Sequence, residues 1–589
     1  MLVATAAAIS AGAMAAPAWA DVPKATIEGV EDKDLREAIQ RLVGESRDPP
    51  ETRFIARRRA NEAAEAAVVV LRSEGYYDYQ VTPEVATSGE PRAVVRIVPG
   101  PRFTIAEPRV EWVESPPEPP VQAKAVEAVR LPPGAPGRAA EVVAAEGRIV
   151  AALSEQGYAD AEARPREVVV DHADRTVRPT YRIAARQPVK LDGLTVRTRG
   201  RTNPEWVKRL APWSNGERYT PDDVAELERR LLDTGVYDSV TVALSPQNDA
   251  QGLRPVVVSL NDRPRASIDL GASYSSAEGF GVDGRYTLYN RLGRADTLTF
   301  GAQYSGILKR LDAQLSLPHW RQVQETLRLS AAVYEDDTDA YRERAVGARF
   351  DLIKRLGRTS YRTYGLGVEG SDNDEKQLIG GQLVAVERQL ATVTALAALT
   401  LDRSDNPLDP TTGWKVDGRI EPTLSAGDGT SAYVRATAQG AAYLPLDEKG
   451  RTVIAGRLRL GSILGGNIPD VPGPRRFFAG GGGSVRGFEY QGVGPRFPDN
   501  TPIGGLSLVE ASLEARRDIT EKWGAVAFVD VGSVGEEQYP DFEDLSVGVG
   551  VGVRYNLSFA PIRLDVAFPV NRREGDAAFQ VYISFGQAF

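Results

Sequence analysis

The residues best suited to specific binding lie near the C-terminal end, in the segment 475–495. This segment contains four consecutive glycines, Gly480–Gly483, followed by Val485-Arg486-Gly487-Phe488. Glycine is needed where φ is positive or where another stretch of backbone comes close, so the run predicts a sharp turn. Arginine presents a planar fork that binds a carboxylate at two points. The segment therefore predicts a folded loop that presents one cation, Arg486, to an acidic partner.

Two later strands carry carboxylates that could serve as this partner, in Leu513-Glu514-Ala515 and Phe528-Val529-Asp530-Val531-Gly532. Side chains alternate between the two faces of a strand, so each acid points away from its apolar neighbours. We predict that the loop dips inward and that Arg486 pairs with Asp530, with Glu514 as a second partner. The alternative is an arginine that stays solvated on an exposed loop.

No covalent chemistry is predicted for this chain, and we expect neither a cofactor nor a metal site. The sequence has no cysteine and two histidines, His172 and His319, which excludes a disulfide framework and a Cys/His zinc cluster. It also lacks a Gly-x-Ser-x-Gly elbow and a P-loop, so a hydrolase has no nucleophile–base pair. We interpret both histidines as structural. The net charge of −9 gives no indication of nucleic-acid binding.

The loop and its acids lie within residues 264–589, whose pattern predicts a transmembrane β-barrel. Segments of about ten residues alternate apolar with polar or small residues, separated by turns rich in Gly, Asp, Asn and Pro. Sixteen strands are predicted, an even number as expected for such a barrel. They begin near Ala266, Gly281, Thr297, Leu311, Leu327, Arg344, Ser360, Ala391, Lys415, Tyr433, Thr452, Leu506, Ala525, Ser546, Ile562 and Phe579.

The longest connection in this pattern, about 465–505, holds the glycine run and Arg486. Long loops are uncommon unless they have a function. The final strand alternates and ends on Phe589, which resembles the C-terminal signal by which outer-membrane barrels are recognised. A soluble β-solenoid or sandwich is the alternative to a barrel.

Residues 21–263 contain three similar units, predicted at 21–101, 102–187 and 188–263. A helix end followed by Gly and a hydrophobic residue recurs at Gly75, Gly157 and Gly235, a near-constant spacing of about 80 residues. Each unit is expected to place two helices on one face of a three-stranded sheet. Exposed sheet edges could receive an extended peptide, or the units could be rigid spacers.

Each unit is expected to have one strand before its helices and two after them. The first strands are predicted at 24–30, 103–113 and 189–196. The later pairs are predicted at 80–83 with 93–98, 161–170 with 176–184, and 239–244 with 254–260. The Pro-rich stretches 115–120 and 132–136 are expected to be loops in the second unit.

Residues 1–20 read as a secretory signal peptide. Ala18-Trp19-Ala20 supplies the small-x-small cleavage pattern, so the mature chain is expected to begin at Asp21. The basic segment that usually opens a signal is missing, since the first cation is Lys24. The alternative is a disordered Ala-rich tail. Together with the barrel, the signal predicts the outer membrane of a Gram-negative bacterium, with the repeats in the periplasm.

The ordered set of features resembles the BamA/TamA superfamily of outer-membrane assembly proteins. The repeats resemble its POTRA domains, Val485-Arg486-Gly487-Phe488 its loop motif and Phe528-Val529-Asp530-Val531-Gly532 its strand motif. Residues 401–413 resemble another characteristic barrel segment. In that family the loop Arg pairs with the strand Asp, which implies Arg486 with Asp530 here. Glu514 matches a second acidic position.

Three repeats and a compact barrel most resemble the TamA subfamily, the outer-membrane subunit of the translocation and assembly module. The resemblance implies a TamB-like, inner-membrane-anchored periplasmic partner and nascent β-barrel substrates, including autotransporters. Lipid transport between the membranes and a polypeptide secretion pore are the alternative functions.

A lateral seam between the first and last strands is the expected working element. The first strand contains Ser267, Leu270 and Gly271, and the last contains Ile583, Phe585 and Gly586. Small residues weaken cross-strand packing, so this closure could open sideways. The exposed edge would then pair with an incoming strand. An ordinary closed seam is the alternative.

Overall fold

The computed structural model of the 589-residue chain describes residues 22–46, 48–86, 90–275, 279–540, 542, 544–557, 561–585 and 587. The expected signal peptide at 1–20, Gly586 and Phe589 lie outside these residues. The described chain divides into two compact units, and the third repeat contributes residues to both. No helix in the described residues is both long enough and apolar enough to cross a membrane.

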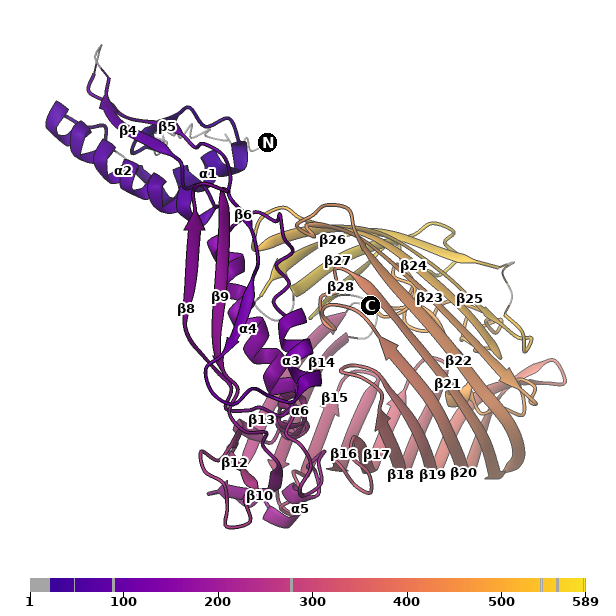
Figure 1. Cartoon of the computed structure of the whole chain (residues 1–589). Coiled ribbons are helices and arrows are strands. Elements are labelled where there is room, and N and C mark those ends of the chain that lie inside the picture. Colours follow the sequence, from indigo (N-terminus) through magenta and orange to yellow (C-terminus); the bar gives the residue numbers. More distant parts are fainter. Residues whose placement is uncertain are drawn as a thin grey trace, which may run out of the picture. The chain divides into compact units, whose positions relative to one another are not determined.

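The first repeat packs helices α1 (Lys33–Val43) and α2 (Arg53–Ser73) on a sheet of order β2-β5-β4 (Figure 1). Its strands are β2 (Thr26–Glu28), β4 (Gln80–Val85) and β5 (Ala93–Val98), and a short pair joins β1 (Val22–Pro23) to β3 (Glu45–Ser46). The Asp32 side chain caps α1 by accepting from the N–H of Asp34 and Leu35. The core includes Ile39, Leu71 and Ile97, all fully buried.

The second repeat has helices α3 (Pro119–Glu127) and α4 (Ala139–Glu155) against strand β9 (Thr176–Ala184) and its neighbours. Strand β9 pairs in parallel with β6 (Thr104–Ile105) and β7 (Arg109–Trp112), and antiparallel with β8 (Glu162–Asp171). The predicted single first strand is therefore two short strands, interrupted at Glu107, where φ is positive. Likewise 119–120 is not loop, because proline is accepted in the first turn of α3.

The third repeat has a sheet of order β10-β12-β11 with two helices. Its elements are β10 (Leu191–Thr198), α5 (Pro204–Lys208), α6 (Pro221–Leu232), β11 (Tyr237–Leu244) and β12 (Arg254–Asp262). The recurring glycines Gly75, Gly157 and Gly235 all have positive φ, as expected for residues that end a helix. Three small α+β domains therefore precede the barrel.

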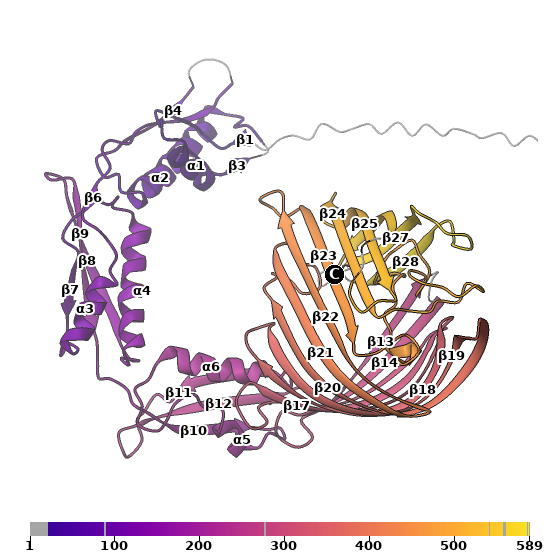
Figure 2. The same ribbon diagram turned by 90° about the vertical axis from the view of Figure 1, so that its right-hand side faces the viewer.

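The barrel is closed by sixteen antiparallel strands, each paired with its neighbours in chain order (Figure 2). They are β13 (Ala266–Ser275), β14 (Gly279–Tyr289), β15 (Thr297–Tyr304), β16 (Leu308–Leu317), β17 (Glu325–Asp337), β18 (Tyr341–Arg355), β19 (Tyr361–Ile379), β20 (Gln382–Asp402), β21 (Gly413–Gly427), β22 (Gly429–Pro445), β23 (Thr452–Leu464), β24 (Ser507–Asp518), β25 (Trp523–Gly535), β26 (Ser546–Asn556), β27 (Pro561–Pro569) and β28 (Gln580–Phe585). The predicted fold class is confirmed.

Fifteen of the sixteen strands start within four residues of their predicted positions. The exception is β20, which begins at Gln382 rather than near Ala391. It forms a long hairpin with β19 around Gly380–Gly381, and the polar cluster Glu387-Arg388-Gln389 separates its first residues from the rest of the strand. A polar cluster outside the membrane-spanning part of a strand resembles a loop in the sequence, because hydrophobic alternation marks only the part inside the membrane.

Candidate functional site: a lumen loop and the barrel seam

The segment 465–506 connects β23 to β24 and folds into the barrel wall around its own hydrophobic core. That core contains Phe477, Val485 and Phe488 from the loop, together with Leu508 and Val534 from the adjoining strands, all almost completely buried. Isolated bridges Phe477–Gly505 and Ala479–Val493 fold the segment back on itself. The loop is therefore a packed part of the barrel.

Arg486 is 2% exposed and lies against three carboxylates. Its Nε and Nη2 donate to Asp530 at 2.7 and 3.0 Å, and its backbone N–H donates to the same group at 3.1 Å. Nη1 lies 2.7 Å from Glu514 Oε1 and 3.2 Å from Asp565 Oδ2. The guanidinium carbon is 3.4 Å from the centre of the Phe528 ring. The structure thus brings together Arg486, Asp530 and Glu514.

Asp565 was missing from the sequence interpretation, although the sequence contains its signal. It sits between Leu564 and Val566 in β27, the same arrangement of an acid between apolar neighbours that singled out Asp530. Arg554 donates to its Oδ1 at 2.5 Å, while Arg516 donates to Glu514 at 2.8 Å. Glu514 and Asp565 therefore each pair with a further arginine, and Asp530 accepts from both the side chain and the backbone of Arg486.

Backbone geometry at two glycines allows this close approach. Gly487 has φ of 102°, a conformation that L side chains rarely adopt. A Cβ on Gly548 in β26 would lie 1.8 Å from the carbonyl oxygen of Arg486. The loop tip can reach the wall only because this wall position lacks a side chain.

Tyr582 connects the loop tip to the last strand. Its hydroxyl accepts from the N–H of Gly487 at 3.1 Å and donates to the carbonyl of Phe488 at 3.3 Å. Tyr582 is also a seam residue, because β28 pairs with β13 through Tyr274–Ile583 and Ser275–Tyr582. The sequence did not single out this tyrosine, since nothing local separates it from other strand aromatics.

The closure between β13 and β28 is short in the described residues. Two residue pairs are recorded there, whereas β13 and β14 form ten. Of the predicted seam positions, Ile583 lies in a recorded pair. Ser267, Leu270 and Gly271 lie earlier on β13, and Ser267 Oγ is 3.0 Å from the Tyr289 hydroxyl of β14. Phe585 ends β28, and its backbone pairs with Ile562 of β27.

A second buried anchor holds the base of the loop and was also missed. Glu375 of β19 accepts from Arg476 Nη2 and from the Gly473 N–H, each at 2.9 Å, and its other oxygen lies 2.6 Å from Arg388. Neighbouring Arg475 pairs with Glu369. Several acids adjoin Glu375 in β19, so the sequence alone could not tell which one a loop would contact. The loop is thus held on two separate parts of the wall.

His319 lies in the turn between β16 and β17, beside the end of α6. Its Nδ1 accepts from the Gln324 N–H at 3.0 Å, and its Nε2–H donates to the Arg230 carbonyl at 3.1 Å. Burial lowers the pKa of His319. The ring borders a cavity of about 480 Å³ where Arg355 pairs with Asp233 at 2.7 Å. Both ring nitrogens of His319 are thus hydrogen-bonded to backbone groups, and His172 Nδ1 lies 2.7 Å from Asp78.

One group of described acids has spacing suitable for a metal ion. The ligand atoms of Asp372, Asp374 and Glu387 lie within 4.8 Å of one another on the exposed ends of β19 and β20. Exposed carboxylates commonly gather without a metal, so this group carries no assignment.

Comparisons with known proteins identify the family of the chain. Residues 290–589 match the model of the Omp85 superfamily domain. The outer membrane protein assembly factor BamA of Neorickettsia risticii is 24% identical over 421 residues, covering 67% of this chain and 55% of that protein. BamA of Nitratidesulfovibrio vulgaris is 24% identical over 459 residues, covering 74% and 56%. The chain spans about half the length of these curated relatives.

The fold also matches that of a solved structure. The crystal structure of BamA from Haemophilus ducreyi lacking POTRA domains 1–3 aligns with a TM-score of 0.69 at 19% identity, covering 82% of this chain and all of that one. The localisation is therefore that of a Gram-negative outer-membrane barrel with periplasmic POTRA domains. The chain belongs to the Omp85 superfamily.

Proposed function

We propose that this protein assists the insertion of other β-barrel proteins into the outer membrane through the seam between β13 and β28. The observation that carries the proposal is that β28 takes part both in the seam and in the contact with the loop tip. It closes the barrel by pairing with β13, and its Tyr582 hydroxyl holds the loop tip at Gly487. Movement at the seam and movement of the loop are therefore coupled through one strand.

The physical driving force is the pairing of unpaired backbone groups. In a bilayer each unsatisfied N–H or C=O costs several kcal/mol, so an opened edge pairs readily with an arriving strand. Among the described residues the closure consists of two residue pairs, so few of their hydrogen bonds are lost when it opens. The proposed cycle opens β13 from β28, adds a client strand to the free edge and releases the client when its own ends pair.

The packed loop favours assembly over a passive pore. Its core residues pack against strand residues of the wall. Two buried ion pairs also hold it, Arg486 with Asp530 and Arg476 with Glu375. A permanently open channel would need the loop to leave these contacts. Single-channel conductance that stays low in the native protein supports the assembly function, and large steady conductance supports a secretion pore.

A reversible lock on the seam tests the proposal. Tyr274 and Ile583 lie directly opposite each other, so Tyr274→Cys/Ile583→Cys places two thiols at disulfide distance. The chain has no other cysteine, so no competing thiol exists. The oxidised variant should fail to insert a client barrel into vesicles, and reduction should restore insertion.

The matched control is Ala272→Cys/Val282→Cys, a directly opposed pair in the β13–β14 hairpin. This disulfide leaves the seam free, so oxidation should not affect insertion. Full insertion by the oxidised seam variant would rule out lateral opening. If the seam lock blocks insertion while lipid exchange between vesicles continues, lipid transport is a separate activity of the protein.

The finer assignment within the superfamily is TamA-like, with autotransporters among the clients and a TamB-like periplasmic partner. The curated relatives, by contrast, are named BamA, so the choice between the two is left to experiment. Strand β4 is an edge of the first sheet and could receive an extended partner segment. A photo-crosslinker at exposed Thr82 should capture a TamB-like protein in cells. Capture of other periplasmic assembly proteins instead would favour a BamA-like role.

A further inference from the structure

Two buried arginines face each other on the inner side of the barrel, near the end at which β13 begins. Arg554 of β26 and Arg563 of β27 are directly opposed in the strand pairing. They are 2% and 8% exposed. Like charges directly opposite each other on neighbouring strands are destabilising, so this pair needs negative charge beside it.

The carboxylate that lies against this pair, Asp565, is shared with a third arginine. Its Oδ1 accepts from Arg554 at 2.5 Å, while its Oδ2 lies 3.2 Å from Arg486 and 4.0 Å from Arg563. One carboxylate thus faces three guanidinium groups. Because arginine keeps its proton in proteins, this excess of positive charge is not removed by titration.

Each arginine of the pair also has one buried nitrogen without a hydrogen-bond partner among the described residues. These atoms are Nη2 of Arg554 and Nη1 of Arg563. The neighbouring nitrogens are engaged, since Arg554 Nε donates to Gln587 Oε1 at 3.2 Å and Arg563 Nε donates to Ser584 Oγ at 2.5 Å. A buried donor without an acceptor is costly, above all on a charged group. The arrangement therefore favours one more acceptor that carries negative charge.

A small cavity beside Arg554 has room for such an acceptor. Its volume is about 40 Å³, which holds about three water-sized groups. The charged residues that line it are four arginines and two aspartates, namely Arg451, Arg516, Arg517, Arg554, Asp409 and Asp518. Both aspartates accept from side-chain amides, Asp409 from Gln587 at 2.9 Å and Asp518 from Asn556 at 3.0 Å. The lining is therefore cationic.

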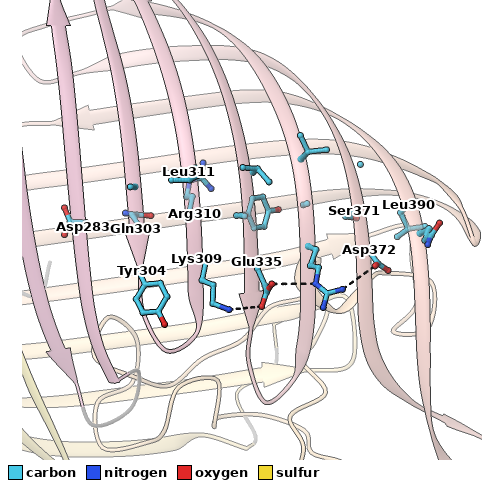
Figure 3. Close-up of a pocket in the computed structure, with 18 of the residues that line it drawn as sticks. Asp283, Gln303, Tyr304, Lys309, Arg310, Leu311, Glu335, Ser371, Asp372 and Leu390 are labelled. Carbon is cyan, nitrogen blue, oxygen red and sulfur yellow. Dashed lines mark hydrogen bonds and ion pairs between the residues drawn. The ribbon is translucent and has the colours of Figure 1, made fainter.

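The excess of cations persists when the adjoining buried charges are included. These add two arginines and three carboxylates, namely Arg486, Arg563, Glu514, Asp530 and Asp565. With the lining, this makes six arginines against five carboxylates. Charges on the outer wall differ, because an ion pair such as Lys309–Glu335 (Figure 3) joins side chains that are 54% and 24% exposed. Buried Arg554 has no such access to solvent.

We propose that this cavity is a binding site for one carboxylate group. The carboxylate accepts from Arg554 Nη2 and offsets the repulsion between Arg554 and Arg563. A carboxylate matches both the planar fork of a guanidinium group and the small volume of the cavity. Two sources share this chemistry, a free small carboxylate and the C-terminal carboxylate of a peptide. Because Arg563 also contacts Ser584 of β28, an occupied site stabilises the wall beside the seam.

The test measures the binding of formate to the full-length protein in detergent micelles. Saturation-transfer NMR detects the formate proton directly, and sodium chloride keeps the ionic strength constant. The native protein should give a saturable signal. Arg554→Gln should weaken formate binding about tenfold, because a charge-assisted hydrogen bond is lost.

A second variant moves a carboxylate of the chain onto Arg554. Asp409→Asn/Gln587→Glu leaves the net charge unchanged and exchanges the acid and the amide of an existing contact. It should keep the native heat-dependent gel mobility and lose formate binding, because its own carboxylate fills the site. This variant decides the test if Arg554→Gln does not fold.

The matched control is Arg349→Gln, which removes an arginine that pairs with Asp351 at 2.7 Å on β18. It should bind formate like the native protein. A short peptide is then added as a competitor, either with a free C-terminal carboxylate or amidated. Displacement of formate by the free form alone assigns the site to a chain end, and displacement by neither form assigns it to free carboxylates. Equal displacement by both forms, no saturable signal from the native protein, or native-like binding by either site variant would overturn the proposal.

Discussion

Replacing Arg486 with alanine should destabilise the loop and the strands around it. The loss is smaller than three broken ion pairs would suggest, because Glu514 keeps Arg516 and Asp565 keeps Arg554. Asp530, fully buried, loses both guanidinium hydrogen bonds and keeps the one from the backbone N–H of residue 486. Removing one partner from a buried pair costs about 3–5 kcal/mol. That is about a hundred- to several-thousandfold in the folding equilibrium.

Two assays report this loss separately. Semi-native gels across a urea series give the unfolding midpoint of the barrel, which should fall in Arg486→Ala. Limited trypsin digestion reports the loop, because Arg475, Arg476 and Arg496 are protected by burial or ion pairing in the native fold. Early cleavage at these sites should appear in the variant.

The double variant Arg486→Met/Asp530→Leu tests whether the lost stability comes from leaving one buried charge without its partner. It removes both charges together and leaves the other two acid–arginine pairs, so most of the lost stability should return. An unchanged urea midpoint in Arg486→Ala would refute the argument that Asp530 depends on this arginine. A double variant as unstable as the sum of the two single variants would show that the charges do not act as a pair.

Three further outcomes follow from the structure. Gly548→Ala should displace the loop tip and expose it to trypsin, because its Cβ would meet the Arg486 carbonyl, whereas Gly440→Ala has open space around its Cβ and should behave as native. Glu375→Ala should release the loop base, since it leaves Arg476 and Arg388 without this buried carboxylate; unchanged protease resistance would contradict that role. Burial lowers the pKa of His319, so the unfolded chain binds the proton more readily and stability falls as pH drops below the ordinary value of 6.5. The urea midpoint should therefore fall between about pH 7.5 and about pH 5.5, and His319→Asn should reduce that fall.

The sequence by itself determined the helices and strands and the face of each strand on which a side chain lies. Period-two alternation depends only on neighbouring residues, so the inward direction of Asp530 and Glu514 followed from Val529, Val531 and Leu513. Helix ends at the recurrent glycines are equally local, because a positive φ is a property of one residue. The start of β20 was misplaced because the polar cluster Glu387-Arg388-Gln389 interrupts its alternation.

Tertiary structure decided which of these residues meet. The partners of Arg486 come from β24, β25 and β27, and the strand pairing of the closed barrel sets their spacing. Tyr582 reaches the loop tip because β28 returns to β13, and Glu375 is selected from its acidic neighbours by the path of a distant loop. Alternation depends only on neighbouring residues, whereas register and closure depend on all strands of the barrel together.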